Sequence, residues 1–482
     1  MSVLSGLKPE RVFYYFEEIC KIPHGSYHTE QISDYLAGFA REHALEYRQD
    51  ESHNVVIRKP ASAGYEKAPV VILQGHCDMV CEKKPGSAHD FAKDGLKLVV
   101  DGDLLRAEGT TLGADDGIAV AYALAILEDD TLKHPELEVV ITTDEEVGML
   151  GAMALDTSDL KGTCMLNLDS EEEGKLWVGC AGGLTAVCEL PVEYREEEGR
   201  EYEIILDGLA GGHSGAEIDK IRASSVKLMG RFLFELSQKT EFYLAKLAGG
   251  QKDNAIPREA RAVFLAGSDE KEVIEGTAAA FQRSVRAEYG GTDETISVRV
   301  SAGGSRKENV LTPLAQQKVL FFLSQIPYGV QKMSGTIDGL VETSMNPGVL
   351  YLGEDVCRVT ASIRSSVGSA KEALADSVQY LTEFLGGVCT REGDYPAWEY
   401  RKDSVLREKM EDIWEQLFGE KPQIAAVHAG LECGLFYEKI PGLDCVSFGP
   451  AMSDIHTTEE TLSISSTERV WKYLLKVLEN IR

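Results

Sequence analysis

The alternation of short apolar strands with helices in the first 180 residues constrains the fold of this chain more than any other feature. The apolar patterns predict strands over 55–59, 68–76, 136–143 and 164–169, and helices over 117–128 and around Ala152. A helix that crosses over between two strands makes them parallel, so this order is typical of a parallel sheet. The sequence therefore predicts an α/β domain with a largely parallel central sheet flanked by helices.

The chain is predicted to return to this domain after a long insertion. Between about residues 184 and 394 the strand and helix patterns come in a different order, and the first pattern then resumes. We expect a first domain made of residues 1–183 and 395–482, interrupted by an inserted α+β domain at 184–394.

A short self-similarity lies inside the insertion. The tripeptide Ala-Gly-Gly occurs at 210–212 and again 92 residues later, and Asn254 and Asn346 are separated by the same offset. Each tripeptide lies between a strand pattern and an apolar helix pattern. This spacing predicts two ferredoxin-like βαββαβ repeats, at about 200–290 and 292–386, unless such short strings recur by chance.

The charge of the chain excludes two classes of partner. Lys and Arg number 49 and Asp and Glu number 79, a net charge of −30, which repels phosphate backbones and anionic membranes. No stretch reaches the ~18–20 apolar residues of a membrane span, and the N-terminus lacks the basic and apolar regions of a secretory signal. The ten cysteines are scattered, as is typical of reduced thiols. We expect a soluble cytoplasmic protein without nucleic-acid or membrane partners.

Side chains that can bind a metal follow the predicted strands. His76 and Asp78 lie two residues apart at a strand end, so both face the same side, and the carboxylate could fix the tautomer of a metal-binding imidazole. This pair alone is weak evidence. Asp115 and Asp116 lie in a Gly-flanked turn before a helix, where two acids could simply stabilise the helix N-terminus.

Three more acidic residues and a histidine continue this pattern. Glu145 and Glu146 follow one strand, Asp169 ends the next, and His456 follows a strand near the C-terminus. Each is most simply a solvated loop residue. However, the strand ends of a parallel sheet converge at one edge. Two histidines and three carboxylates are about the number of ligands that two zinc ions sharing one carboxylate need.

Eight short motifs occur in one order across essentially the whole chain, namely HCD, GADDG, TTDEEVG, NLD, GGHSG, SIR, HAGLECG and IHTTEE. In these motifs the sequence resembles the dinuclear zinc peptidases of the aminoacylase and carboxypeptidase G group. HAGLECG and the doubled central region resemble the aminoacyl-histidine (Xaa-His) dipeptidases within that group.

The resemblance implies a role for each candidate metal ligand. His76 and His456 would be terminal ligands of two different zinc ions, and Asp115 would bridge the ions. Glu146 and Asp169 would complete one site each. Mn²⁺ or Co²⁺ are possible substitutes for the two Zn²⁺ ions.

The same resemblance implies the roles of neighbouring residues. Asp78 would orient His76, and Glu145 would be the general base of the reaction. The peptide bond after Asp115 would be cis.

The resemblance also makes the insertion a lid that carries substrate-binding residues, although each has a simpler explanation. His213 would stabilise the oxyanion, or only make local hydrogen bonds at a helix start. Arg364 would clamp the substrate carboxylate, or lie on the surface of a strand. Asn254 either faces the substrate or does not, and Glu432 either contacts the substrate amine or braces the site.

The doubling of the lid affects whether a lid residue acts in the active site of its own chain or in that of a partner subunit. In relatives with a single lid repeat, the resemblance implies that the lid histidine reaches the active site from the partner subunit. Here Ser305 takes the position of His213 in the second repeat. We therefore expect His213 to serve its own chain, whether the protein is a monomer or a homodimer.

Together these features predict a cytoplasmic dizinc dipeptidase that hydrolyses Xaa-His and other unblocked dipeptides. An N-acyl-amino-acid or tripeptide hydrolase with the same metals is the alternative. A dimetal phosphoesterase is disfavoured because no basic or Asn-rich phosphate clamp accompanies the acids. A non-catalytic metal-binding protein is disfavoured because both Glu145 and Glu146 are present, and a protein that only binds metal needs no general base.

Overall fold

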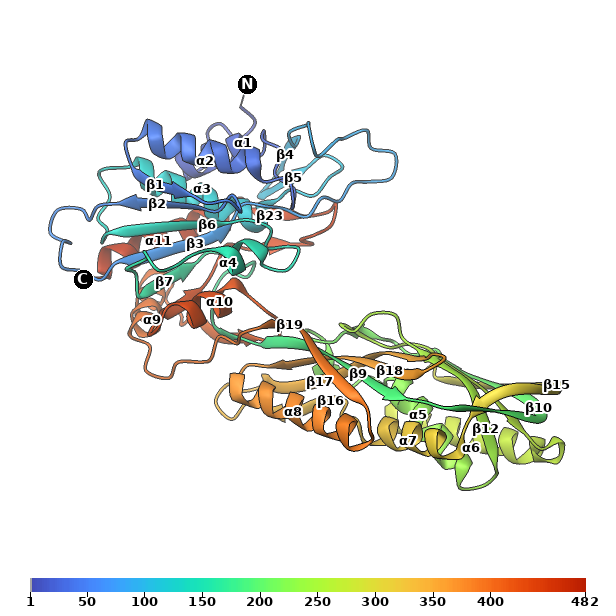
Figure 1. Ribbon diagram of the computed structural model, residues 1–482. Helices are drawn as coiled ribbons and strands as arrows, with labels where there is room; N and C mark the ends of the chain where they lie inside the picture. Colours follow the sequence, from blue (N-terminus) through green and yellow to red (C-terminus); the bar gives the residue numbers. More distant parts are fainter. Residues whose placement is uncertain (1) are drawn as a thin grey trace. The chain divides into compact units, whose positions relative to one another are not determined.

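The computed structural model describes residues 2–482, which form two compact units (Figure 1). Unit 1 contains the chain up to Gly179 together with Tyr400–Ala426 and Leu431–Arg482. Unit 2 contains Cys180–Glu399 and Val427–Gly430. Each unit has a hydrophobic core of its own.

Unit 1 is built around an eight-stranded sheet with the strand order β1-β2-β6-β3-β7-β21-β8-β20, beside a small sheet with the order β22-β23-β5-β4. Its elements are α1 (Glu10–Ile19), α2 (Glu30–Glu42), β1 (Glu46–Gln49), β2 (Val55–Lys59), β3 (Val71–His76), β4 (Leu98–Asp101), β5 (Leu104–Ala107), α3 (Ala114–Glu128), β6 (Leu137–Thr142), α4 (Leu150–Ala154), β7 (Cys164–Asn167), β8 (Lys175–Cys180), α9 (Val405–Phe418), β20 (Gln423–Val427), α10 (Glu432–Lys439), β21 (Asp444–Ser447), β22 (Met452–Ser453), β23 (Thr461–Ser463) and α11 (Ile464–Asn480).

The centre of the large sheet is parallel, which confirms the predicted fold class. β3 pairs in parallel with β6 and β7, and β7 pairs in parallel with β21, whereas the pairs β1–β2, β2–β6 and β8–β21 are antiparallel. Every residue of β3 and β6 is buried, as expected for parallel strands covered on both faces. The four parallel strands therefore end at the same edge of the sheet.

Helices cover both faces of this sheet. α1, α2, α3, α9 and α11 share one hydrophobic core with it. α3 has no polar face, because its Ala, Ile and Leu side chains are buried all around the helix. α4 and α10 pack together on the opposite face, where Lys439 of α10 donates to three carbonyls at the C-terminal end of α4.

Unit 2 is built around a nine-stranded sheet with the order β15-β10-β14-β12-β17-β18-β9-β19, in which β16 pairs with β17. Its elements are β9 (Gly182–Pro191), β10 (Tyr194–Asp207), β11 (Gly212–His213), η1 (Ile218–Lys220), α5 (Ser225–Ser237), β12 (Phe242–Gly249), β13 (Ala255–Ile256), β14 (Ala260–Ala266), η2 (Ser268–Glu270), α6 (Lys271–Tyr289), β15 (Ser297–Leu311), α7 (Pro313–Gln325), β16 (Gly329–Met333), β17 (Val341–Leu352), β18 (Val356–Ser365), α8 (Gly368–Phe384) and β19 (Val388–Tyr395).

The two halves of this sheet have mirrored strand orders. β10, β12, β14 and β15 follow one another in sequence and lie in the order 4-1-3-2, with α5 and α6 as the crossover helices. β9, β17, β18 and β19 take the same order in reverse, with α7 and α8. β12 pairs with β17 where the halves meet. Helices α5 to α8 lie on one face of the sheet (Figure 1).

The strand order differs from the repeat boundaries expected from the sequence. β15 closes the first half beside β10, and the second half begins at β9, which precedes the first half in the chain. The second Ala-Gly-Gly lies inside β15, where Ser305 pairs with Arg200. Ser305 therefore does not correspond to His213 of β11. The offset was misleading because short strings can recur without occupying equivalent places in a fold.

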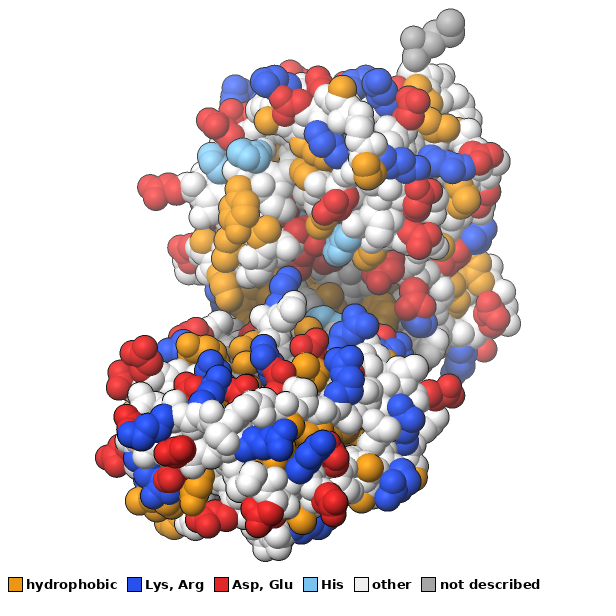
Figure 2. Space-filling view, turned by 90° about the vertical axis from the view of Figure 1, so that its right-hand side faces the viewer, with side chains coloured by type: hydrophobic (Ala, Val, Ile, Leu, Met, Phe, Trp, Pro, Cys, Tyr) orange, Lys and Arg blue, Asp and Glu red, His pale blue; other side chains and the backbone are white. Residues whose placement is uncertain are grey.

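Charged side chains of both signs are interspersed over the face seen in Figure 2. Many of them form exposed ion pairs, such as Arg231 with Glu288, and pairs of this kind contribute little to stability. Within residues 2–482, no helix is both long enough and apolar enough to cross a membrane.

Candidate active site

The parallel strands of unit 1 bring the predicted metal ligands to one edge of the sheet. His76 is the last residue of β3, Glu146 follows β6, and Asp169 follows β7. Asp115 lies in the first turn of α3, and His456 lies between β22 and β23. Five residues that are up to 380 positions apart in the chain thus meet at one place.

Asp115 lies between the two histidines and presents one oxygen to each. Its Oδ1 is 3.4 Å from Nε2 of His76, and its Oδ2 is 3.1 Å from Nε2 of His456. Asp169 Oδ1 lies 3.8 Å from the same nitrogen of His76, and Glu146 Oε1 lies 2.9 Å from that of His456. Among the described residues, His76, Asp115 and Glu146 can form one metal-ligand group, and His76, Asp116 and Asp169 can form a second.

Asp78 holds both His76 and the chain that follows β6. Nδ1 of His76 lies 3.0 Å from the main-chain oxygen of Asp78 and 3.4 Å from its carboxylate. The carboxylate accepts the N–H groups of Glu145 and Glu146, at 3.0 and 3.4 Å, and the hydroxyl of Ser26. Since both ring nitrogens of His76 then face acceptors, the ring orientation is fixed.

Asp116 is a site residue to which the sequence analysis gave no role. It is fully buried, it can form a metal-ligand group with His76 and Asp169, and its Oδ1 has no hydrogen-bond partner among residues 2–482. Its other oxygen accepts the N–H of His76. Gly75 permits this approach, because a Cβ there would lie 2.4 Å from Asp116 Oδ2. The Asp115–Asp116 peptide bond is cis, as the resemblance implied.

The acidic cluster shifts the ionisation of its members. Burial opposes ionisation of Asp115, but hydrogen bonds to His456 and His76 outweigh it and lower the pKa of this carboxyl. Asp115 and Glu146 in turn raise the pKa of His456 to about 10. Within the described part of the chain, no Lys or Arg forms an ion pair with Asp115, Glu146 or Asp169. Such a concentration of carboxylates is compensated best by bound cations.

Glu145 has a different environment from the neighbouring ligand Glu146. Burial raises the pKa of Glu145 to about 8, and the negative charges of Glu432, Glu146 and Asp115 contribute to this rise although His76 opposes it. A carboxylate with a pKa in this range can both accept and release a proton near neutral pH.

Glu432 lies beneath this site at the start of α10. It is fully buried, and its Oε2 accepts hydrogen bonds from Gln74 of β3 and Thr142 of β6. Gln74 in turn accepts from Asn167 of β7. These bonds tie α10 to the three strands that carry the ligands, while the other oxygen, Oε1, has no hydrogen-bond partner among the described residues. Whether Glu432 braces the site or contacts the substrate amine stays a prediction.

Glu460, the last residue of the IHTTEE motif, is a second residue that sequence reasoning missed. Its carboxylate accepts the N–H groups of Leu112, Gly113 and Ala114, at 2.7 to 3.1 Å. These amides form the turn that leads into Asp115, so Glu460 fixes the approach to the shared ligand. The IHTTEE motif includes this residue, but no pattern in the neighbouring sequence indicated that it accepts hydrogen bonds from the turn before Asp115.

Unit 2 contains a separate group of polar residues. Arg364 of β18 donates from Nη1 to the hydroxyl of Tyr395, 2.9 Å away, and its Nε is buried without a partner among the described residues. Burial, with the nearby charge of Arg364, lowers the pKa of His213 and lowers that of His428 to about 4. Asn254 is exposed in the loop before β13, and its carbonyl accepts the N–H of Ser214. His428 and Tyr395 had no predicted role.

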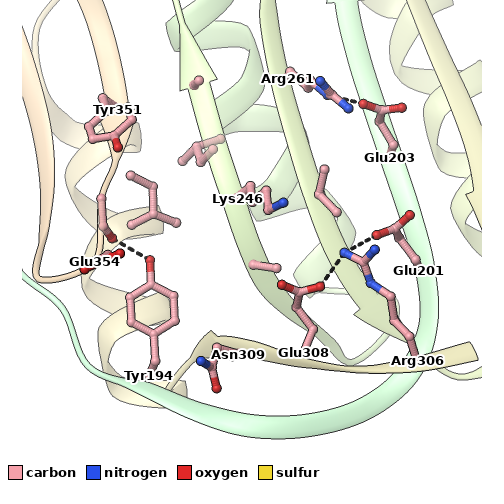
Figure 3. Close-up of a pocket in the computed structure, with 16 residues that line it drawn as sticks. Tyr194, Glu201, Glu203, Lys246, Arg261, Arg306, Glu308, Asn309, Tyr351 and Glu354 are labelled. Atoms are coloured by element: carbon pink, nitrogen blue, oxygen red, sulfur yellow. Dashed lines mark hydrogen bonds and ion pairs between the residues drawn. The ribbon is translucent and has the colours of Figure 1, made fainter.

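A wide groove of unit 2 lies elsewhere, on the sheet face that α5 to α8 leave uncovered. It has a volume of about 960 Å³ and is shown in Figure 3. Arg261 pairs there with Glu203, and Arg306 lies between Glu201 and Glu308. Because its arginines are neutralised within the groove, we assign no reaction chemistry to it.

Comparisons with known proteins show the family of this chain. The model of the family described as Peptidase family M20/M25/M40 matches residues 72–480. The cytosol non-specific dipeptidase of Escherichia coli (strain K12) is 36% identical over 100% of this chain and 99% of its own. The crystal structure of aminoacylhistidine dipeptidase from Vibrio alginolyticus is also 36% identical, with a TM-score of 0.93 and coverage of 99% and 98%. An aminopeptidase from Bacillus cereus shares the fold alone, at 15% identity and a TM-score of 0.56 over 98% and 99% of the chains.

Proposed function

The chain belongs to peptidase family M20/M25/M40, and from this membership we propose that it is a metal-dependent dipeptidase acting on Xaa-His and other dipeptides with free termini. The two relatives that match it at 36% identity over essentially their full length are named as dipeptidases. The observation that carries the proposal is the position of Asp115, which offers one carboxylate oxygen to each of two histidines.

The donor set fits two divalent cations. His76 and Asp169 would hold one ion, His456 and Glu146 would hold the other, and Asp115 would bridge them. Imidazole nitrogen with carboxylate oxygen suits zinc, with manganese or cobalt as substitutes. When bound, such ions would polarise the scissile carbonyl and make a water molecule more acidic.

The proton transfers are the task of Glu145. Its carboxylate accepts a proton from the attacking water and delivers it to the leaving amine, and such a shuttle is most efficient when its pKa lies near the working pH. The buried environment that raises the pKa of Glu145 to about 8 supports this role. Asp78 supports it too, because its carboxylate holds the N–H of Glu145 and faces the ring of His76.

Unit 2 supplies the groups that recognise the rest of the substrate. His213 offsets the negative charge that develops on the carbonyl oxygen, and Arg364 binds the C-terminal carboxylate through its planar guanidinium. Asn254 contributes a further polar contact. A clamp on the C-terminal carboxylate restricts the substrates to short peptides. Tyr395, which accepts from Nη1 of Arg364, fixes the direction of that guanidinium.

Location and assembly complete the proposal. One relative is named as a cytosol enzyme, and we extend a cytoplasmic location to this protein. The acidic net charge of −30 argues against nucleic-acid and membrane partners. The protein acts as a monomer or a homodimer.

The test is hydrolysis by the purified protein after its metals are stripped and replaced with Zn²⁺, Mn²⁺ or Co²⁺. The substrates are Xaa-His dipeptides, other dipeptides, the same dipeptides with an acetylated N-terminus, and tripeptides. We expect turnover of free dipeptides, abolished by stripping and restored by metal. Preferential cleavage of the acetylated or three-residue substrates would instead establish the N-acyl or tripeptide hydrolase, and metal-independent turnover would exclude the proposed mechanism.

A further inference from the structure

The main chain that follows His213 fixes the protonation of its ring. The N–H groups of Gly215 and Ala216 donate to Nδ1 of His213, at 3.2 and 3.0 Å. A nitrogen that accepts two hydrogen bonds from amides carries no proton of its own. The single proton of a neutral imidazole must therefore be on Nε2.

The backbone of His213 is held just as firmly. Its N–H donates to Glu217 Oε2 at 2.9 Å, and its neighbour Ser214 donates to the carbonyl of Asn254. The hydrogen bond from Lys220, with that from His213, lowers the pKa of Glu217 to about 2, so this acceptor stays charged. The hydrogen bonds of the turn therefore hold the ring of His213 in one position.

Gly215 is required where the turn meets the segment Val427–Gly430. A Cβ at Gly215 would lie 2.7 Å from the carbonyl oxygen of His428 and 3.0 Å from Cε1 of His213. Both distances are shorter than ordinary contacts, and the first involves backbone that cannot rotate away. The ring of His428 anchors this segment, because its Nε2 lies 2.7 Å from the hydroxyl of Ser344 on β17.

The other ring nitrogen of His213 is available to a ligand. His213 is half-buried, and no group within residues 2–482 forms a hydrogen bond with its Nε2. Burial and the charge of Arg364 lower the pKa of His213, so the ring is neutral at neutral pH. A neutral ring with Nδ1 occupied can only donate from Nε2.

We propose that His213 acts as a neutral hydrogen-bond donor through Nε2, and that Gly215 is a positioning residue that fixes this tautomer by keeping its own N–H and that of Ala216 on Nδ1. The inference deepens the proposed function, in which His213 stabilises the developing charge on the carbonyl oxygen, and rests on that function for its catalytic consequence. It also explains the last glycine of the GGHSG motif, because a side chain at position 215 would displace the turn that holds the ring of His213.

The tautomer can be observed directly, without substrate. Long-range ¹H–¹⁵N correlation spectra of the metal-loaded protein with ¹⁵N-labelled histidine are compared with spectra of His213→Asn, which identify the ring signals of His213. We expect a pyridine-type shift for Nδ1 and a pyrrole-type shift for Nε2. The reverse pattern, or two pyrrole-type nitrogens, would overturn the proposal.

Variants test the catalytic consequence. In His213→Asn the side-chain oxygen can accept the same two amides, as Asn does at helix starts, but the Nε2 donor is lost. We expect an unchanged melting temperature and metal content, with kcat about 10²–10³-fold lower and little change in KM. In Gly215→Ala we expect the His213 signals to show a tautomer mixture and kcat to fall. Gly276→Ala, a helical glycine with open space around it, controls for the added methyl group.

The outcomes separate this inference from the proposed function. If the wild-type protein cleaves no dipeptide, the proposed function fails, and the spectrum still decides the tautomer. If it cleaves dipeptides but His213→Asn keeps the wild-type kcat, the donor role is wrong. If Gly215→Ala folds and keeps both the wild-type kcat and the Nε2–H tautomer, Gly215 is not a positioning residue. Should Gly215→Ala fail to fold, the spectrum and His213→Asn still decide.

Discussion

Glu145 and Glu146 are adjacent in the chain, yet their carboxylates have different surroundings. Glu146 lies 2.9 Å from Nε2 of His456, whereas burial dominates the environment of Glu145. We expect Glu145→Gln to keep both metal ions and to lose about 10²–10⁴-fold in kcat, because an amide cannot accept the proton of the water. Glu146→Gln should instead lose metal, because a neutral ligand replaces an anionic one. Atomic emission beside the steady-state rate separates the two.

The assignment would be wrong if Glu145→Gln emptied a metal site while Glu146→Gln did not. Each variant serves as the control for the other, since both replace a glutamate with its isosteric amide at neighbouring positions.

His428 makes the stability of the protein depend on pH. Burial, with the charge of Arg364, lowers its pKa from 6.5 to about 4 in the folded protein. As the pH falls, the imidazole of His428 is therefore protonated in the unfolded chain before it is protonated in the folded protein. The contribution of neutral His428 to the free energy of unfolding is fully present above pH 6.5. It is lost as the pH falls from 6.5 to 4, which lowers the free energy of unfolding by up to about 3 kcal/mol.

We expect His428→Gln, which can keep a hydrogen bond to Ser344, to lose less stability than the wild type over this pH range. Urea unfolding at pH 7 and pH 4.5 measures the difference. His43→Gln, at an exposed position, is the control. Parallel losses in wild type and His428→Gln would contradict the prediction.

At the scale of secondary structure, the turn before α3 depends on a carboxylate from the far end of the chain. Glu460 accepts three N–H groups of this turn, and removing its charge leaves some of these buried donors without a partner. We expect Glu460→Gln to destabilise the protein by about 1–3 kcal/mol and to weaken metal binding by displacing Asp115. Thermal melting with and without metal checks both effects.

Glu459 provides the matched control for this change. Its exposed side chain pairs with Lys84 on the surface, and exposed pairs contribute about 0–1 kcal/mol. Glu459→Gln should leave both the melting temperature and the metal affinity unchanged. Equal effects of the two substitutions would show that the turn does not depend on Glu460.

At the scale of the whole molecule, the two halves of the unit 2 sheet are joined within one chain through β12 and β17. A chain that contains both halves needs no second copy to complete this sheet. We therefore predict that His213 and Glu145 of the same chain act in one catalytic step. Inactive His213→Ala is mixed with inactive Glu145→Gln under conditions that exchange subunits. We expect no activity to return.

Recovery of substantial activity in the mixture would mean that His213 serves another chain. Two copies of the same inactive variant, treated identically, give the background rate. The oligomeric state alone does not decide the matter, because a homodimer can form through a surface that carries no site residue.

Local patterns in the sequence predicted the main elements of unit 1 and the candidate residues of the site. Continuous apolar runs mark strands that are buried on both faces, and β2, β3 and β6 lie where these runs predicted them. An acid in a Gly-flanked turn and acids at strand ends predicted Asp115, Glu146 and Asp169 as ligands, because a parallel sheet brings its strand ends to one edge. The family resemblance is confirmed by relatives that match along the whole chain.

Only the tertiary structure decided which distant groups meet. The hydrogen bonds of Glu460 span more than 340 residues. β9 pairs directly with β18, although the whole first half of the sheet lies between them in the sequence. The tautomer that we propose for His213 depends on a turn in which a side chain at position 215 would clash with the carbonyl of His428. Periodicity and propensity describe a window of roughly ten residues, whereas these contacts are selected by the packing of the whole chain. The physical reason is that strand pairing and buried hydrogen bonds gain their free energy only after non-local loops have closed.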